Sequence, residues 1–524
     1  MPSEAARQQH RAPADLRISE EPRPARSQLE WLIDNGEAYE SLVSAIQGAR
    51  ESIWISQLAF DADCSVYGSD DAGSETKPQG DNLLDAILAT SDEHRVSVKI
   101  LLNSTLLLDT KRPLVRFLSS RKLDSGLVEV RGISRFPQLL HAKMVILDGR
   151  RAFLMGSPFV NGYWDTPSHH PADSRRPRRE LGGRPVHDVS LGVHGPVVGD
   201  LAQTFARLWN GAAQRGLDHL TPIEAPSVDR SAKAPRVEVV TTAPRGSRRS
   251  RDSGSLETLD KLLEGIQGAR SMIYIEHQYL SSRPVVHALR RALDRERTLE
   301  IILVLNQNPD VTAYRRWQNA RLAGDRLLAH PRVGAFALWS AAGSKQPVPL
   351  ITQVFVHSKV VIIDDEWAMV GSANLDGASL NSYGDDFTNP FARRLFRDVR
   401  NFDVSLVLHR GWGSVRAPNP VRRLREQLWA EHFGHGVTGA SEPRARARLS
   451  TWRAIASGNV AALNRGGAGA SGKGSFILPY STSPTPREQL ANVGVLPSAP
   501  MRLEFDPGWL EVNFSPNWIR NMFL

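Results

Sequence analysis

Apolar positions along this chain follow two spacings, and the same succession of spacings occurs twice. Stretches with the three-to-four-residue spacing of an amphipathic helix, around Tyr39–Ile46 and Leu259–Ile266, each lead into a short run of β-branched and aromatic residues. The segments at these points are similar and share the run IQGAR, because residues 45–56 read AIQGARESIWIS and residues 265–276 read GIQGARSMIYIE. This self-similarity predicts an internal duplication.

The repeat extends through the elements that follow. Each copy continues with a polar helix and an apolar strand that finishes in asparagine, VKILLN at Asn103 and IILVLN at Asn306. Another pair of strands is predicted at LVEVRG (127–132) and VGAFALW (333–339). Strands that alternate with helices favour an α/β fold. We therefore predict two duplicated α/β halves, each a mixed, mostly parallel sheet flanked by helices, packed with pseudo-two-fold symmetry around one active site.

A change in composition separates the halves. Residues 222–254 are rich in Pro, Ser and Arg, although VEVVTT at 237–242 is interpreted as the first strand of the second half. An insertion at 166–185, which contains RRPRRE, is interpreted as a solvated basic loop. The predicted units are a disordered N-terminal tail (1–28), a first half (29–222), a second half (223–440) and a C-terminal extension of open role (441–524).

Composition narrows the class of partner. The chain has 524 residues, 41% hydrophobic and 23% charged, which is typical of a globular protein, and its net charge of +9 favours anionic partners. The single cysteine, Cys64, excludes an intrachain disulfide and is predicted to be a buried thiol. The N-terminus shows no apolar signal core and no run of about 18 apolar residues occurs, so we expect neither a signal peptide nor a transmembrane helix. These features predict a cytoplasmic protein, with peripheral attachment to a membrane left open.

The residues with the clearest chemistry occupy equivalent points of the two repeats. One group lies in HAKMVILDGRRAFLMGS and comprises His141, Lys143, Asp148 and Ser157. The other lies in HSKVVIIDDEWAMVGSAN and comprises His357, Lys359, Asp364, Ser372 and Asn374. Two copies at matching points of a duplication are hard to explain by core packing, so we interpret them as functional.

The spacing within each group suggests how it acts. His and Lys two residues apart on a strand project from one face, and an Asp-Gly or Asp-Asp turn returns the chain to Gly-Ser. Packing of the halves would bring both histidines, both lysines and Asn374 around one cleft, with Ser157 and Ser372 supporting phosphate binding. This set suits a phosphodiester, because one imidazole attacks phosphorus while the other protonates the departing oxygen. We expect Asp148 and Asp364 to fix the turns or to pair with a basic residue, and no metal-ligand cluster is apparent.

Both groups resemble the HKD signature of the phospholipase D superfamily, which is His-x-Lys, four residues, Asp, six residues, then Gly-Ser-x-Asn. The copy around His357 fits at every position through Asn374. The copy around His141 departs, because seven residues separate its Asp from its Gly and Phe159 stands where Asn is expected. The first half therefore has one phosphate donor fewer, unless Asn161 takes that place.

Segments outside the signatures resemble the phospholipase D branch of that superfamily, over roughly residues 30–460. They are NGYWDTPSHH (161–170), VHDVSLGVHGPVVGDL (186–201), FARLWN (205–210), IYIEHQYL (273–280) and LREQLWAEHFG (424–434). The resemblance implies a metal-independent, two-step reaction through a phosphohistidine, with His141 as the nucleophile and His357 as the general acid.

The resemblance also implies an acidic residue downstream of each motif that orients its histidine. Asp188, in VHDVSL, fits this place after the first motif. Asp403, in NFDVSLVL, fits it after the second motif, and Asp385 or Asp386 compete with Asp403 for orienting His357.

These features favour a phospholipase D-type phosphodiesterase. It would hydrolyse glycerophospholipids or pass the phosphatidyl group to an alcohol, acting as a monomer at a membrane surface and without a cofactor. The alternative enzyme is a nuclease or another phosphodiesterase, with nucleic acid as its partner. A binding protein whose first site has decayed is the third hypothesis, motivated by the missing Asn and opposed by the two intact His-Lys pairs.

Overall fold

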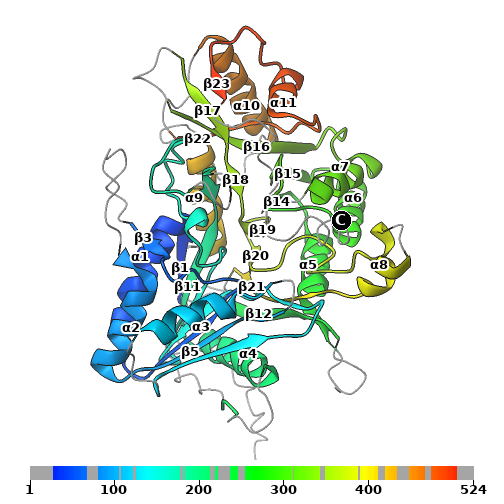
Figure 1. Cartoon of the computed structure of the whole chain (residues 1–524). Coiled ribbons are helices and arrows are strands. Elements are labelled where there is room, and N and C mark those ends of the chain that lie inside the picture. Colours follow the sequence, from blue (N-terminus) through cyan, green and yellow to red (C-terminus); the bar gives the residue numbers. More distant parts are fainter. Residues whose placement is uncertain are drawn as a thin grey trace, which may run out of the picture.

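Two sheets with the same strand order form the centre of the molecule in the computed structural model (Figure 1). In Figure 1 the first half (blue to cyan) lies at the lower left, the second half (green to yellow) at the right, and the C-terminal segment (orange to red) at the top. The structure describes residues 28–67, 81–105, 108–121, 126–177, 181, 183–212, 219–221, 236–245, 254–310, 312–342, 348–387, 390–410, 419–433, 448–466 and 474–503. Residues 1–27 of the predicted tail, and the predicted boundary at 222/223, lie outside these ranges.

The strand order of the first sheet recurs in the second. The first sheet runs β1 (Gln28–Ile33), β11 (Val189–His194), β9 (Arg151–Leu154), β8 (Met144–Leu147), β2 (Ser52–Ser56), β5 (Ser97–Asn103), β6 (Val128–Ile133). The second runs β12 (Arg236–Ala243), β21 (Asn401–His409), β20 (Trp367–Gly371), β19 (Lys359–Ile363), β14 (Met272–His277), β15 (Glu300–Leu305), β16 (Val333–Ala342). Each strand has a counterpart at the same position in the other sheet, which confirms the predicted duplication.

The sheets are mixed, as predicted, but they are not mostly parallel. Among the described strands of this repeated order, only β2–β5–β6 and β14–β15–β16 run parallel. The other neighbours are antiparallel. The reason is the turn inside each motif, because β8–β9 and β19–β20 are hairpins and a hairpin pairs its strands antiparallel. The prediction of a mostly parallel sheet was wrong because it did not count the predicted hairpin of each motif among the strands of the sheet.

Helices cover the outer face of each sheet. On the first sheet, α1 (Asp34–Gln47) buries Tyr39, Leu42 and Ile46 at helical spacing and packs beside α2 (Leu83–His94). On the second sheet, α5 (Glu257–Gly268) and α6 (Arg283–Arg295) occupy the equivalent place. A third helix of each half, α3 (Lys111–Ser120) or α7 (Thr312–Gly324), precedes the strand β6 or β16. An outer core lies between each sheet and these helices. Cys64 lies in the outer core of the first half and is buried, as predicted.

One apolar core joins the two halves. Helices α4 (Val197–Gly211) and α9 (Pro420–Phe433) each reach the opposite half, α4 contacting β12 and α9 contacting β1. Side chains from both sheets and both helices form a single cluster, which includes Trp54, Ile146, Leu191, Trp209, Ile362, Val370, Leu406 and Trp429. Since burying one large apolar side chain stabilises a fold by roughly 1.5–3 kcal/mol, this shared core fixes the halves relative to each other.

The C-terminal extension packs on the second half. In it, α10 (Arg448–Asn464) contacts β16, and β22 (Gly474–Pro479) pairs antiparallel with β16. Trp452 of α10 lies against Phe336 and Trp429, and so enters the shared core. The extension continues through α11 (Pro486–Asn492) to β23 (Arg502–Leu503), which pairs with β17 (Leu350–Gln353).

Several short elements complete the described fold. They are β3 (Ser65–Val66), β4 (Asp81–Asn82), β7 (Leu139–Leu140), β10 (Val186–His187), β13 (Ser255–Leu256), β18 (Phe355–Val356), α8 (Pro390–Leu395) and 3₁₀ turns at Asn161–Tyr163 and Gly384–Asp386. In the described part of the chain, no helix combines the length and the apolar character that crossing a bilayer requires.

The insertion at 166–185 is not the solvated basic loop that was predicted. In its described part, Arg175 and Arg176 are 3% exposed. Arg175 pairs with Asp173 at 2.7 Å and lies over the ring of Trp164, while Arg176 pairs with Asp165 at 2.6 Å. The prediction was wrong because it treated the arginines as a run of like charge, whereas neighbouring aspartates neutralise them.

Candidate active site

The two motif histidines follow short strands that pair with the opposite half of the molecule. The strand before His141, β7, is parallel to β21, and the His141 backbone N–H donates to the carbonyl of Phe402 at 3.0 Å. The strand before His357, β18, is parallel to β10, and the His357 N–H donates to the carbonyl of His187 at 2.8 Å. Equivalent pairings thus bring both histidines to the contact between the halves.

The asparagine that finishes an apolar strand of each repeat holds the segment before each histidine. Asn103 donates its amide to the carbonyl of Leu140 at 2.9 Å and accepts from the Leu140 N–H at 2.8 Å. Asn306 binds the backbone of Val356 in the same way, at 2.9 and 3.2 Å. A side-chain amide suits this task because it supplies both a donor and an acceptor. The repeat pattern marked both residues, but only the structure shows what they hold.

Each imidazole is bound by a carboxylate from the other half. Nδ1 of His141 lies 2.6 Å from Oδ1 of Asp403, and Nδ1 of His357 lies 2.7 Å from Oδ2 of Asp188. The expectation that each acid orients the histidine of its own motif was therefore wrong, because the pairing is crossed. The physical reason is the pairing of β7 with β21 and of β10 with β18, which places each acid-bearing segment beside the opposite histidine.

The competing acids of the second half do not take this place. Asp386 pairs with Arg283 at 2.8 Å and also with Arg321. The side chain of Asp385 lies outside the described residues. Among the described carboxylates, Asp188 is therefore the one that contacts the imidazole of His357.

The motif serines bind the same carboxylates. The Ser372 hydroxyl donates to Oδ1 of Asp403 at 2.8 Å, and the Ser157 hydroxyl donates to Oδ2 of Asp188. A hydroxyl has a single proton to donate. These serines therefore position the carboxylates, and this role replaces the predicted support of phosphate binding.

Both carboxylates stay ionised although they are buried. Burial acts to raise the pKa of Asp188, but the ring of His357 and the charge of Lys359 outweigh it and lower that pKa to about 2. The same balance, with the imidazole and the lysine of the first motif, lowers the pKa of Asp403. An ionised carboxylate only accepts hydrogen bonds, so Nδ1 of each imidazole is the donor and Nε2 carries the lone pair.

Both imidazoles are neutral at physiological pH. Burial and the neighbouring charge of Lys143 lower the pKa of His141 to about 4, although Asp403 opposes the shift. Burial and Lys359 lower the pKa of His357 to about 3. A neutral ring whose Nε2 lone pair is free of a proton is the form that attacks an electrophile.

Two buried lysines flank the imidazoles. Nζ of Lys143 lies 3.1 Å from Nε2 of His141 and donates to the His141 carbonyl at 3.2 Å. Nζ of Lys359 donates to the carbonyl of His357. Burial and the charge of Lys359 lower the pKa of Lys143 to about 7, and burial lowers the pKa of Lys359 to about 8. Two desolvated ammonium groups that repel each other form an anion site, since a bound anion would favour the charged form of both.

The two halves differ at the last motif position. Asn374 is buried, and its Oδ1, a hydrogen-bond acceptor, has no partner among the described residues. Its counterpart Phe159 is fully buried among aromatic neighbours of the outer core. Asn161 does not replace the missing amide, because it accepts from the Ser65 N–H at 2.8 Å and donates to Asp63.

Two polar residues beside the motifs were missed by sequence reasoning. Gln57 follows β2 and His277 ends β14, each one position beyond the segments that define the repeat. Both are buried, and neither the Gln57 amide nor Nδ1 of His277 has a hydrogen-bond partner in the described ranges. His277 stands opposite Lys359 in the register of β14 and β19. Comparing the repeats one residue further would have identified both positions.

The motif aspartates lie in the turns of the motif hairpins, as predicted, and they also bind the start of a central strand. Asp148 accepts the backbone N–H groups of residues 50–52 at 2.7–2.9 Å. Asp364 accepts those of residues 270–272 at 2.7–2.8 Å. Both aspartates have positive φ angles, 52° and 55°, in the tight turn of the motif hairpin. Their contacts are structural.

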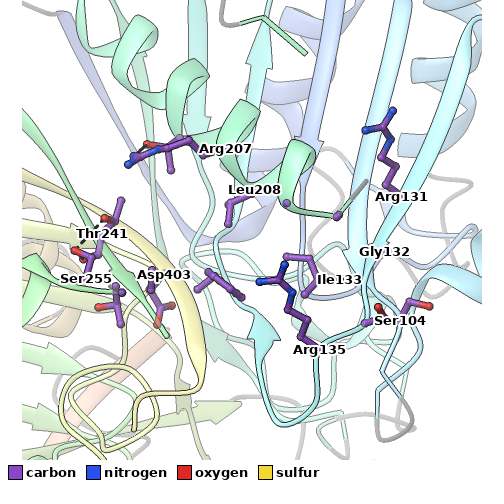
Figure 2. Close-up of a pocket in the computed structure, with 18 of the residues that line it drawn as sticks. Ser104, Arg131, Gly132, Ile133, Arg135, Arg207, Leu208, Thr241, Ser255 and Asp403 are labelled. Atoms are coloured by element: carbon purple, nitrogen blue, oxygen red, sulfur yellow. Dashed lines mark hydrogen bonds between the residues drawn. The ribbon is translucent and has the colours of Figure 1, made fainter. Parts of the chain in front are cut away.

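A cavity of about 760 Å³ lies behind Asp403, between β6, α4 and β12 (Figure 2). Figure 2 shows Arg131, Arg135 and Arg207 around it. Its charge is partly balanced, because Arg131 pairs with Glu129 at 2.7 Å. Of the described motif residues and their acids, Asp403 alone lines this cavity, so we assign it no part in phosphate binding.

A cluster of side chains able to bind a metal lies beside the histidine site. Asp34, His169, His187 and Glu431 are buried, with ligand atoms within 4.8 Å of one another. The sequence showed no such cluster because its members are scattered along the chain and converge only in the fold.

The chain matches two family models, "Cardiolipin synthase, PLD-like domain" over residues 262–387 and "Phospholipase D" over residues 349–480. Phospholipase D A of Dictyostelium discoideum is 22% identical over a match covering 56% of this chain and 27% of that relative. Cardiolipin synthase B of Escherichia coli (strain K12) is 25% identical over 67% of this chain and 73% of that relative. The match thus spans about a quarter of the length of the first relative.

The solved structures that match this chain share less sequence identity with it than these relatives do. Phosphatidylserine synthase of Haemophilus influenzae Rd KW20 shares 13% identity at a TM-score of 0.49, covering 82% of this chain and 93% of that chain. The phospholipase D family member Nuc of Salmonella typhimurium shares 15% identity at a TM-score of 0.23, covering 38% and 93%.

Proposed function

Because this chain is a member of the phospholipase D superfamily, we propose that it transfers the phosphatidyl group of a glycerophospholipid to water or to an alcohol through a phosphohistidine. The observation that carries the proposal is the crossed pair of contacts, His141 with Asp403 and His357 with Asp188, flanked by two buried lysines. A site of near two-fold symmetry suits two similar steps, since the first forms a nitrogen–phosphorus bond and the second breaks it.

In the first step Nε2 of His141 attacks phosphorus. Its lone pair forms the nitrogen–phosphorus bond while the bond to the head-group oxygen breaks, and that oxygen takes a proton from Nε2 of His357. Asp403 stabilises the His141 ring as it gains positive charge. The anionic phosphodiester itself favours protonation of His357 when it arrives beside that ring. The order of the two motifs in the family is the basis for choosing His141 as the nucleophile.

In the second step the acceptor hydroxyl gives its proton to His357 and its oxygen attacks phosphorus. The nitrogen–phosphorus bond breaks, and His141 returns to its neutral form. Lys143, Lys359 and the amide of Asn374 stabilise the negative charge on the non-bridging oxygens in both steps. Because these groups supply the positive charge, we propose that the reaction needs no added divalent cation.

The names of the matched models and relatives support phospholipid as the substrate class. Water as the acceptor would give phosphatidic acid, and an alcohol would give a new diester. The net charge of +9 favours an anionic membrane surface, where basic residues are attracted to acidic lipids. Cleavage of nucleic acid by the same chemistry is the alternative outcome of the test.

The test uses purified full-length chain and vesicles of phosphatidylcholine and phosphatidylglycerol, without added divalent cation. We expect phosphatidic acid in water and phosphatidylethanol when ethanol is present, because both acceptors intercept the same intermediate. Cardiolipin formed from phosphatidylglycerol would identify transfer to a lipid alcohol. A plasmid DNA reaction runs beside the lipid reactions.

The control variants are His141→Ala and His357→Ala, with His170→Gln as an exposed histidine outside the site. The first two should lose lipid turnover, and His170→Gln should keep it. If the lipid stays intact and the DNA is cleaved, the substrate is nucleic acid and the lipid proposal is wrong. Lipid turnover that persists in both alanine variants would contradict the phosphohistidine.

A further inference from the structure

A ring of four metal-ligating side chains lies in the interior beside the proposed active site. Asp34 begins α1, His169 lies in the insertion at 166–185, His187 ends β10, and Glu431 lies near the end of α9. Their side chains are at most 6% exposed. Three of these residues belong to the first half and Glu431 to the second, so the ring joins the halves.

The ligand atoms lie close enough together for small side-chain shifts to place them around one ion. Nδ1 of His187 lies 2.8 Å from Oε1 of Glu431 and 3.1 Å from Oδ1 of Asp34. Nε2 of His169 lies 3.0 Å from Oε1 of Glu431 and 3.5 Å from Oδ2 of Asp34. Ligands at about 2.0–2.2 Å from a tetrahedral ion are about 3.3–3.6 Å apart, so the three shorter distances would widen by a few tenths of an ångström when the ring holds one ion.

Hydrogen bonding leaves atoms of this ring unused. Oδ2 of Asp34 is buried and has no hydrogen-bond partner among the described residues. Nδ1 of His187 is also buried without a hydrogen-bond partner among the described residues, because its close approaches to the two carboxylates lack hydrogen-bond alignment. An unsatisfied buried polar group costs about 1–3 kcal/mol, and more when it is charged. A cation at the centre of the ring would satisfy both atoms.

Each histidine of the ring already has its other nitrogen on a carboxylate. Nε2 of His187 lies 2.8 Å from Oε1 of Glu276, and Nδ1 of His169 lies 2.9 Å from Oδ2 of Asp165. A carboxylate behind a metal-binding histidine orients the ring and keeps the lone pair of the other nitrogen toward the metal. The pattern recurs at both histidines, which a chance contact does not explain.

We propose that Asp34, His169, His187 and Glu431 bind one divalent transition-metal ion, with zinc as the best match. Two imidazole nitrogens and two carboxylate oxygens are ligands that zinc accepts in four-coordinate sites. Calcium fits less well, because it takes six to eight oxygen ligands. All four positions are filled by side chains, so the ion stabilises structure and leaves the proposed chemistry to the two motif histidines.

The ion would hold the segment that supports His357. The Asp34 N–H donates to the carbonyl of Asp188 at 2.8 Å, and the Asp188 N–H donates to Oδ1 of Asp34 at 3.2 Å. The carbonyl of His187 accepts the backbone N–H of His357 at 2.8 Å. Coordination of Asp34 and His187 would therefore fix the backbone that carries the Asp188 carboxylate to its histidine.

The metal content of the full-length chain tests the proposal directly. The chain is produced without a polyhistidine tag in zinc-supplemented medium, desalted, and analysed by inductively coupled plasma mass spectrometry. We expect about one zinc ion per chain, lost on prolonged dialysis against a strong chelator with a lower Tm, and regained with zinc. Cobalt in place of zinc should give the visible absorption bands of a four-coordinate ion.

The variants His169→Gln and Glu431→Gln should each bind zinc at least about tenfold more weakly, while the neighbouring His170→Gln keeps it. Circular dichroism separates loss of metal from loss of fold, and a folded variant with full metal content would remove that residue from the site. The proposal is overturned if the wild-type chain binds none of zinc, manganese, iron or cobalt and chelation leaves its Tm unchanged. Neither result depends on whether phosphatidyl transfer is found.

Discussion

The two halves build matching frameworks but end their motifs differently. Each supplies a histidine, a lysine and a carboxylate at equivalent positions of the same strand order. The second half adds the buried amide of Asn374, whereas the first places Phe159 in the core between its sheet and outer helices. Under the proposed function, the comparison predicts symmetric proton chemistry and unequal phosphate contacts. A single amide would then distinguish the two faces of an otherwise two-fold site.

The halves also depend on each other. Neither histidine is oriented by its own half, because Asp403 holds His141 and Asp188 holds His357. Substitution of a carboxylate in one half is therefore expected to change the orientation of the histidine in the other half.

The largest effect is expected from the histidines. His141→Ala and His357→Ala should each lower kcat/KM on phosphatidylcholine by about 10⁴-fold or more, because each residue takes part in both steps. The variants should differ with a phosphatidyl ester of nitrophenol, which leaves without a proton. With this substrate, His357→Ala should accumulate the phosphatidyl group on His141, detected as acid-labile phosphohistidine by mass spectrometry. A phosphatidyl group found on His357 in the His141→Ala variant would reverse the assignment of nucleophile and acid.

The carboxylates should give the next largest effect. Asp403→Asn and Asp188→Asn should each lower kcat by about 10²–10⁴-fold, because an amide no longer enforces the Nδ1–H tautomer. In ¹⁵N-histidine NMR spectra, Asp403→Asn should displace the Nδ1–H signal of His141 and leave that of His357. Asp386→Asn is the control, since Asp386 pairs with arginines. A displaced His357 signal in Asp403→Asn would disprove the crossed pairing.

The difference between Asn374 and Phe159 predicts a loss of activity for a variant at the first and a loss of stability for a variant at the second. Asn374→Ala should lower kcat/KM by about 10²–10³-fold with little change in Tm, as expected for one donor to a transition-state oxygen. Phe159→Ala should lower the free energy of unfolding by about 3–5 kcal/mol, because it opens a cavity in the core, while folded molecules keep their kcat. Chemical denaturation and steady-state kinetics on both variants separate these effects. Equal losses of kcat would show that the halves contribute alike to phosphate binding.

The pH dependence of kcat should follow the first motif, because in the enzyme–substrate complex the anionic phosphodiester favours the protonated form of His357. His141, with a pKa of about 4, must be neutral to attack, so kcat should rise as pH increases through that value. Lys143, whose pKa of about 7 is raised by the bound anion, must be charged to stabilise the phosphate, so kcat should fall at a pH above that value, by about tenfold per pH unit. Lys143→Arg should move the alkaline limb upward, because a guanidinium stays protonated. An unmoved limb would assign it to another group.

The sequence contained the framework of this site because its signals are local. Helical and strand spacings repeat about 220 residues apart, and His-x-Lys with its turn needs only one hairpin. The crossed pairing was not predictable, since β7 meets β21 across about 260 residues and no local pattern records that contact. Burial of Arg176 was missed for a different reason, because its partner Asp165 is only 11 residues away and the basic run was considered without it.

The smallest effect is expected at Asp148 and Asp364, and it concerns stability alone. Asp148→Ala and Asp364→Ala each leave three backbone N–H groups without their acceptor, which should cost about 1–3 kcal/mol and lower Tm by a few degrees. The loss should be slightly larger for Asp364, because it also accepts the Ser271 hydroxyl at 2.7 Å. Asparagine at either position should restore part of the stability, since its carbonyl still accepts. Differential scanning calorimetry measures these shifts, and an unchanged kcat in the folded variants would place the third residue of each signature in the framework and leave the chemistry to the other two.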